Sequence, residues 1–213
     1  MTCIVCKSKS ISSFITKDKK TYWQCSCCSV KFLDQAFFID EDTEKARYLE
    51  HQNEIGDPAY LKFLSKLSKP LKTKLKSDDR GLDFGCGHGP ALAEMFKEDG
   101  YSIDLYDPFF YPNKEVFSNK YNFITCTETA EHFFNPNREF KTLDSILAPG
   151  GWLGIMTTFL TEDKSFESWH YRRDPTHVVF YAEQTFEVIA EQNNWQLEIP
   201  AKDIALFCKN RDS

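Results

Sequence analysis

Residues 82–90 read LDFGCGHGP, and this stretch decides the fold of the chain. An apolar run precedes the glycines, and the helix-forming run ALAEMFKE follows them. Glycines between a strand and a helix let the backbone turn sharply and let a ligand approach the main chain. Asp107 follows Gly87 by 20 positions, at the end of the next predicted strand, where a carboxylate can accept the hydroxyl groups of a ribose. The stretch therefore predicts a strand–loop–helix unit that binds a ligand.

The sequence around this unit alternates between strand-like and helix-like segments. The predicted strands cover residues 80–85, 101–107, 121–128, 152–159, 195–200 and 203–209. The predicted helices cover residues 89–100, 137–151 and 182–194, and the second of them ends in a Pro-Gly-Gly turn. Such alternation is typical of an α/β fold with a doubly wound, mostly parallel sheet.

This part of the chain resembles the class I S-adenosylmethionine-dependent methyltransferases. A dinucleotide-binding Rossmann site is the rival, but Pro90 stands where its last glycine belongs. The resemblance covers about residues 80–210, including LAPGGWLGI before the fifth strand of the family and a reversed seventh strand. It implies a Rossmann-like sheet and a cofactor held by the glycine loop and the ribose acid. The implied cofactor-binding residues are Asp83, Gly85, Cys86, Gly87, Asp107, Pro108 and Thr127.

The sequence departs from the family pattern after the ribose acid. Family members place a helix and a third strand there, whereas this chain offers only PFFYPNKEVFSNK before the next strand. The third strand is therefore predicted to be short or absent, and no acid is assigned to adenine. The aromatic residues Phe109, Phe110 and Tyr111 either cover the adenine or pack in the interior.

The segment ETAEH, residues 128–132, lies where the fourth strand of the family ends. Two methyltransferase subfamilies pair a Glu-x-x-Glu-His segment with a later histidine. One methylates the terminal 2′-hydroxyl of small RNAs, and the other O-methylates polyprenyl-dihydroxybenzene intermediates of quinone synthesis. In both, the four side chains bind a divalent cation beside the methyl donor. The matching residues here are Glu128, Glu131, His132 and His177.

Physical chemistry agrees with a cation at this position. The spacing of three and four residues places the first three side chains on one face of a helical turn. Two neighbouring carboxylates repel each other unless a positive charge lies between them. Carboxylate and imidazole ligands suit Mg²⁺, Mn²⁺ or Zn²⁺, which lower the pKa of a bound hydroxyl. The alternatives are a metal-free pocket with a catalytic histidine or glutamate, and acids that only stabilise a helix N-terminus.

The segment WHYRRDPTH around His177 supplies further candidates. Arg172 and Arg173 are predicted to bind an anionic group of the substrate through their planar guanidinium groups. His170 and Tyr171 are predicted to act as catalytic proton acceptors, together with His132, His177 and Glu131. In the alternative interpretation this is a structural loop in which Arg173 pairs with Asp174.

Cysteines cluster near the N-terminus in two Cys-x2-Cys pairs, separated by 18 residues. This spacing is typical of a zinc ribbon with four thiolate ligands and a closed structural site. The predicted ligands are Cys3, Cys6, Cys25 and Cys28. Cys27 is a spare thiol that can replace Cys28, and buried free thiols are the alternative to zinc.

The chain is therefore predicted to contain a zinc ribbon (residues 1–38), a helical linker or lid (39–78) and a methyltransferase domain (79–213). In the helical part, Tyr48 and His51 lie one turn apart. They either cap the cofactor pocket or take ordinary core and surface positions.

The composition of the 213 residues fits a soluble cytoplasmic protein, since the N-terminus lacks a signal peptide and no apolar run is long enough to span a membrane. The net charge of −6 argues against a broad nucleic-acid surface. We therefore expect a methyltransferase that acts on a small-molecule hydroxyl. The alternatives are an RNA methyltransferase whose ribbon grips RNA, and a non-catalytic cofactor-binding or assembly protein. The sequence predicts no oligomeric state.

Overall fold

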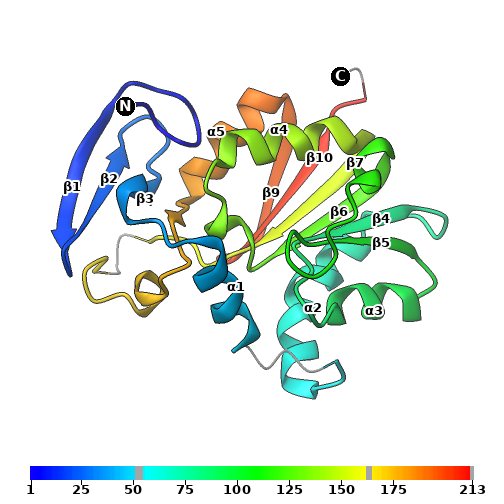
Figure 1. Cartoon of the computed structure of the whole chain (residues 1–213). Helices are drawn as coiled ribbons and strands as arrows, with labels where there is room; N and C mark the ends of the chain where they lie inside the picture. The colour runs from blue at the N-terminus through cyan, green and yellow to red at the C-terminus, as the bar shows by residue number, and fades with distance from the viewer. Residues whose placement is uncertain (51–54, 162–164, 212–213) are drawn as a thin grey trace.

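The computed structural model describes residues 1–50, 55–161 and 165–211, which form two sheets (Figure 1). His51, for which the sequence leaves open a cap on the cofactor pocket or an ordinary core or surface position, lies outside these residues. None of the helices in the described ranges is long and apolar enough to cross a membrane.

The larger sheet has six strands in the order β5-β4-β6-β7-β10-β9. Their bounds are β4 (Arg80–Phe84), β5 (Ser102–Tyr106), β6 (Tyr121–Thr127), β7 (Leu147–Met156), β9 (Trp195–Ala201) and β10 (Ile204–Lys209). The pairs β5–β4, β4–β6 and β6–β7 are parallel, whereas β10 is antiparallel to both β7 and β9. The predicted α/β fold with a reversed last strand is confirmed.

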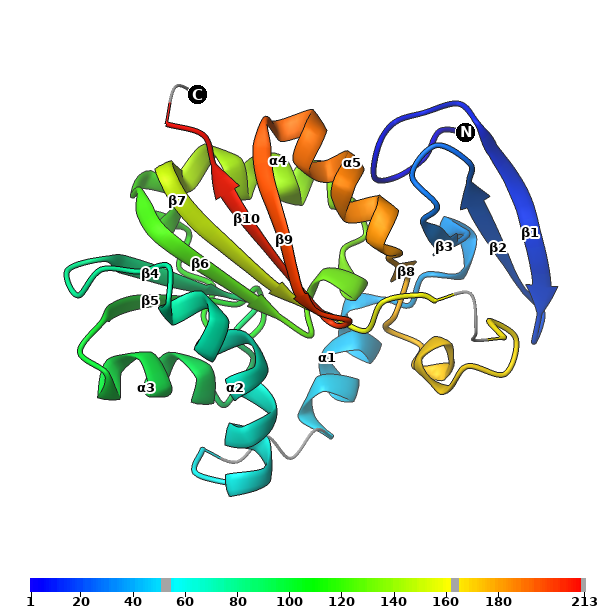
Figure 2. The ribbon, with the colours of Figure 1, turned by 180° about the vertical axis from the view of Figure 1, so that it is seen from behind.

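Helices cover both faces of this sheet (Figures 1 and 2). One face is covered by α2 (Pro58–Lys72) and α3 (Ala91–Glu98), the other by α4 (Pro136–Ile146) and α5 (Glu183–Asn193). Helix α2 begins where the Asp57 carboxylate accepts the Ala59 N–H, and it buries Leu64, Leu67 and Leu71 along one side. Gly154 of β7 has no side chain, which leaves room for Leu67 and Leu71.

Two features of the sheet differ from an ordinary alternation. Between β5 and β6 the chain forms only an isolated Asp107–Tyr111 bridge and the 3₁₀ helix η2 (Lys114–Ser118), so β5 is an edge strand and the expected absence of a third strand is borne out. Strand β7 begins at Leu147, five positions before the predicted Trp152. The predicted helix is therefore too long, because α4 ends at Ile146. The Pro-Gly-Gly stretch is an irregular turn within β7, since the pairing with β6 jumps from Tyr121–Leu147 to Phe123–Trp152 and Gly150 has a φ of +79°.

The smaller sheet has the order β1-β2-β3-β8. Its first three strands come from the cysteine-rich N-terminal part: β1 (Ile11–Lys17), β2 (Lys20–Cys25) and β3 (Lys31–Leu33). The fourth, β8 (Val179–Phe180), comes from just before α5, where no strand is predicted from the sequence. We use the name ribbon for residues 1–38. Its buried apolar side chains join those around the larger sheet in one hydrophobic core.

A short helical segment connects the ribbon to α2. The 3₁₀ helix η1 (Gln35–Phe37) leads into α1 (Glu41–Leu49), which begins where the Asp40 carboxylate accepts the Thr43 N–H. Its Tyr48 reaches side chains that follow the parallel strands. This part of the fold therefore borders the edge of the sheet where ligands bind in α/β proteins.

Candidate functional site

The glycine loop between β4 and α3 needs its first two glycines for different reasons. Gly85 and Gly87 both have positive φ, +76° and +64°. A Cβ on Gly85 would lie 2.2 Å from the Thr129 side chain, whereas a Cβ on Gly87 would meet nothing within 4 Å. Gly85 therefore allows close packing, and the backbone at Gly87 borders open space that a ligand can enter.

Two buried carboxylates stand beside this loop. Asp107 follows β5 and accepts the backbone N–H of Gly87 (3.0 Å) and of Phe109 (2.9 Å). Asp83 in β4 accepts the Thr125 hydroxyl at 2.7 Å, and burial raises its pKa to about 6. The predicted ribose acid is thus held against the glycine loop by hydrogen bonds.

The remaining predicted cofactor-binding residues differ in their surroundings. The Thr127 hydroxyl, at the end of β6, is buried and has no hydrogen-bond partner among the described residues. A buried polar group without a partner is uncommon and is readily satisfied by a ligand. Cys86 is half-buried within the glycine loop, and Pro108 is exposed after Asp107.

Glu131, His132 and His177 meet at the carboxyl end of β6, with one ligand atom from each within 4.8 Å of the others. The Nδ1 atoms of the histidines lie 3.1 Å from the Thr176 carbonyl oxygen and 2.7 Å from the Tyr171 carbonyl oxygen, respectively. Because a carbonyl oxygen only accepts, each Nδ1 carries a hydrogen, and in a neutral ring the lone pair is then on Nε2. Burial lowers the pKa of His132 to about 4, so its ring is neutral at neutral pH.

Glu131 is completely buried and held by two hydroxyl groups. Thr157 donates to its Oε2 at 2.9 Å, and Tyr171 donates to its Oε1. The Thr157 hydroxyl also contacts the Tyr171 hydroxyl at 2.9 Å. Sequence reasoning missed Thr157, although its position directly after the apolar strand β7 was a usable signal.

Glu128 does not share the helical turn that the sequence predicts. The turn is the 3₁₀ helix η3 (Ala130–His132), and Glu128 precedes it in the left-handed region with φ of +46°. Its backbone N–H still donates to the Met156 carbonyl at 2.8 Å, which extends the β6–β7 pairing. The argument from helical spacing is therefore wrong for Glu128, which is not part of the three-residue cluster. Burial and the nearby Glu131 raise its pKa to about 9.

The residues before His177 do not all face the cluster. The 3₁₀ helix η4 (His170–Arg173) leaves His170 exposed and buries Tyr171. Burial and the Glu131 carboxylate raise the pKa of Tyr171 far above its usual range. Its phenol therefore donates a hydrogen bond to Glu131 and is unsuited to the predicted role of proton acceptor.

The two predicted substrate arginines lie elsewhere. Arg172 is buried and donates to Asp18 of the ribbon at 2.9 Å. Arg173 is exposed. The alternative pairing of Arg173 with Asp174 is not seen, because Asp174 accepts from Arg47 of α1 at 2.9 Å and 3.2 Å.

Tyr48 of α1 covers the cluster. Its ring meets the His132 ring edge-on, with centroids 5.2 Å apart, and lies 5.6 Å from the ring of Phe109. The Tyr48 hydroxyl donates to Glu44 at 2.7 Å. Helix α1 thus places the Tyr48 ring in contact with both the cluster and the segment after Asp107.

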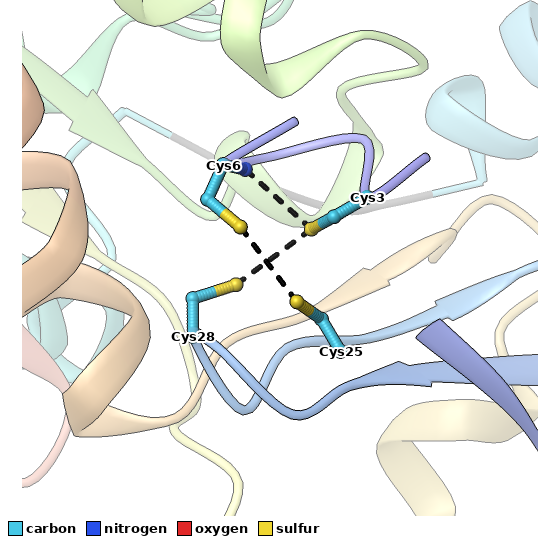
Figure 3. Close-up of side chains that lie close together, drawn as sticks. All are labelled: Cys3, Cys6, Cys25 and Cys28. Atoms are coloured by element: carbon cyan, nitrogen blue, oxygen red, sulfur yellow. Dashed lines mark hydrogen bonds between the residues drawn. The ribbon is translucent and has the colours of Figure 1, made fainter. Parts of the chain in front are cut away.

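The ribbon holds a second cluster, in which four cysteine sulfurs converge (Figure 3). Their Sγ atoms all lie within 4.8 Å of one another, with Cys3–Cys28 at 3.7 Å and Cys6–Cys25 at 3.6 Å. Cys27 is exposed, so the fourth member is Cys28.

The chain matches a family model described as a methyltransferase domain over residues 48–198, more than half of its length. It belongs to this methyltransferase family. The match includes the glycine loop and both clustered histidines, whereas the four clustered cysteines of the ribbon precede it. No curated protein matches the chain significantly.

Solved methyltransferases share the fold at low sequence identity. A 1,6-didemethyltoxoflavin-N1-methyltransferase from Burkholderia thailandensis, solved with 1,6-didemethyltoxoflavin and S-adenosylhomocysteine, is 12% identical, with a TM-score of 0.54 over 93% of this chain and 99% of that chain. An O-methyltransferase family protein from the same organism is 12% identical, with a TM-score of 0.52 over 83% and 61%. A SAM-dependent methyltransferase from Archaeoglobus fulgidus is 19% identical, with a TM-score of 0.50 over 67% and 76%.

Proposed function

We propose that this methyltransferase transfers a methyl group from S-adenosylmethionine to a hydroxyl group of a small molecule, assisted by a divalent cation. The observation that carries the proposal is the position of the two site components. The glycine loop with Asp107 follows β4 and β5, and the Glu131–His132–His177 cluster follows β6, the other neighbour of β4. Donor and acceptor sites therefore adjoin at one edge of the sheet.

The residues of the loop fit the methyl donor. The open space at Gly87 leaves room for a ligand against the backbone, and the Thr127 hydroxyl is a free buried partner for it. Asp107 and Asp83 would hold the ribose and the methionine end, as in the family that the sequence resembles. S-adenosylmethionine supplies a methyl group on a positively charged sulfur, which a buried acidic site accommodates.

The cluster fits a divalent cation. Backbone carbonyls hold the Nδ1 hydrogens of both histidines, so each neutral ring would offer the lone pair of its Nε2 to a cation. Thr157 and Tyr171 orient Glu131 in the way that outer hydrogen bonds orient metal ligands. A cation bound there lowers the pKa of a coordinated acceptor hydroxyl. The alternative in the same site is metal-free, with the Nε2 atom of His132 or His177 accepting the proton.

The charges around the site favour a small acceptor over RNA. Arg47 is paired with Asp174 and Lys66 with Asp203. Arg173 is exposed and has no ion pair among the described residues, but the acids of the site, Asp83, Asp107, Glu128 and Glu131, outnumber it. A phosphate-bearing acceptor needs cations that are not already neutralised. RNA remains the alternative acceptor, and a non-catalytic cofactor-binding or assembly protein is the second alternative. The intact histidine cluster weighs against the latter.

The four cysteine sulfurs of the ribbon are proposed to hold a structural zinc ion. Four thiolates form a closed tetrahedral site, and the structure brings the four sulfurs together on two knuckles (Figure 3). Such an ion stabilises a small sheet with little core of its own.

The acceptor class is tested by incubating the protein and isotope-labelled S-adenosylmethionine with a metabolite extract and, separately, with total RNA. The proposal expects label in the small-molecule fraction, and expects a His177→Ala variant to lose it. Label in RNA alone would overturn the small-molecule acceptor. Absence of label from both fractions, with the donor bound, would favour the non-catalytic alternative.

Counting metal ions tests the second site. We expect purified protein saturated with Zn²⁺ to hold two equivalents by elemental analysis. Cys3→Ser should remove one, and His177→Ala the other. His170→Ala, in the same segment but exposed, serves as the matched control and should keep both. If only one equivalent binds, and Cys3→Ser removes it, the cluster holds no metal.

A further inference from the structure

The segment of residues 171–180, here the His177 segment, is attached to the ribbon at its first end through Arg172. The Arg172 side chain is only 4% exposed. Its guanidinium group donates to the Asp18 carboxylate at 2.9 Å and to the Tyr22 hydroxyl at 3.2 Å. Both partners belong to the ribbon, so an arginine beside the site is used to bind the ribbon.

The second end of the His177 segment is attached through backbone hydrogen bonds. Strand β8 pairs with β3, and the Leu33 N–H donates to the Val178 carbonyl at 2.9 Å. The Val178 N–H donates to the Glu131 carbonyl, also at 2.9 Å. Val178 therefore joins the ribbon to the cluster through its backbone, and His177 is the residue directly before it.

The cysteine knuckles are attached to the helix that follows. The Thr185 hydroxyl of α5 donates to the Cys28 carbonyl at 2.7 Å, and the Gln192 side chain donates to the Cys6 carbonyl at 3.0 Å. The ribbon is thus bonded to the chain on both sides of β8. A displacement of the ribbon would move the His177 segment with it.

We propose that the ribbon is the positioning element for His177, and that Arg172 is a positioning residue of the reaction. Rather than gripping an acceptor, the ribbon holds the His177 segment so that the His177 ring lies beside the His132 ring, with centroids 4.8 Å apart, and close to Glu131. This inference rests on the proposed function for its effect on turnover. A misplacement of about 1 Å in a catalytic site can cost about a hundredfold in rate.

The test compares Arg172→Met with Lys209→Met. Lys209 is a matched control, because its side chain is 10% exposed and pairs with Asp144 at 2.9 Å, on the opposite edge of the fold from the cluster. The first measurement is the NMR resonance of the His177 Nδ1–H, which the Tyr171 carbonyl protects from exchange. The second separates kcat from the dissociation constant of S-adenosylmethionine.

Arg172→Met is expected to broaden or abolish the His177 resonance and to lower kcat at least tenfold, with donor affinity within twofold of wild type. Lys209→Met should preserve both, and Arg172→Lys should recover part of the loss. If Arg172→Met keeps the resonance and kcat as Lys209→Met does, the inference is overturned.

The resonance separates this inference from the proposed function, because it requires no turnover. If the wild-type protein methylates no acceptor, the proposed function is contradicted. The positioning role is overturned only if the His177 resonance is unchanged in Arg172→Met. Should Arg172→Met not fold, Asp18→Asn replaces it. Asp18 is exposed and has a φ of +55°, which asparagine tolerates, and we expect the same loss in weaker form.

Discussion

Asp83 shows at the scale of a single residue how a buried carboxyl group lowers stability at neutral pH. The residue is 3% exposed, and burial raises the pKa of its carboxyl group from 3.8 to about 6. At pH values between these two pKa values, Asp83 binds more protons in the folded state than in the unfolded chain. The contribution of Asp83 to the free energy of unfolding is therefore greatest below pH 4 and falls as the pH rises through 6.

We expect Asp83→Asn to raise the free energy of unfolding at pH 8 by about 1–3 kcal/mol and to change it little at pH 4. Asparagine retains an oxygen for the Thr125 hydroxyl but carries no buried charge. Urea unfolding at both pH values measures the difference. An equal change in the free energy of unfolding at pH 4 and pH 8 would contradict the burial of a charge. The variant should also bind the methyl donor more weakly.

Residue-scale prediction from the sequence succeeded where the reasoning was local. The positive φ values of Gly85 and Gly87 follow from a strand–glycine–helix pattern within a few residues. The predicted position of Glu128 on the same helical turn as Glu131 was wrong, because the backbone of Glu128 is in the left-handed region. Arg172 was expected to face a substrate, yet its partner Asp18 lies 154 positions away, and nothing near Arg172 in the sequence indicates this pairing.

At the scale of elements, an ion pair helps to hold α1 over the cluster. Arg47 donates to Asp174, and the Asp174 carboxylate also accepts the Thr176 N–H and hydroxyl, at 3.0 Å and 2.6 Å. The pair therefore ties α1 to the loop that precedes His177. The packing of Tyr48 on His132 depends on the same helix.

Arg47→Met is expected to increase amide hydrogen exchange in α1 by about three- to tenfold, because a partly buried ion pair contributes about 1 kcal/mol. Hydrogen-exchange mass spectrometry measures the change. Lys74→Met, which removes the surface pair with Glu198, is the control and should leave α1 unaffected. Equal exchange in α1 of the two variants would show that the pair does not hold the helix.

Elements with strong periodicity were predictable, and those defined by distant partners were not. The helix that follows the glycine loop was expected from its apolar pattern and found as α3. Strand β8 has two residues and exists through its pairing with β3, so only the apolar run before α5 hinted at it. The missing third strand was predictable, because too few residues separate β5 from β6.

At the scale of the whole molecule, the ribbon and the α/β part share one hydrophobic core. The cysteine spacing predicts the four-sulfur cluster but not its docking on α5 and β8, which depends on contacts between the two ends of the chain. The family match fixes the activity class and begins after the ribbon. The role of the ribbon therefore has to be read from its contacts with the His177 segment.

The central claim is that the glycine loop and Asp107 bind S-adenosylmethionine, and isothermal titration calorimetry tests it most directly. The wild-type chain should bind one equivalent. Asp107→Ala should weaken binding at least about tenfold, or about 1.4 kcal/mol. Asp104→Ala, in the strand that Asp107 follows but paired with Arg80, should change it less than twofold. Wild-type protein that gives no binding heat, and no protection of the loop from exchange by the donor, would contradict the account.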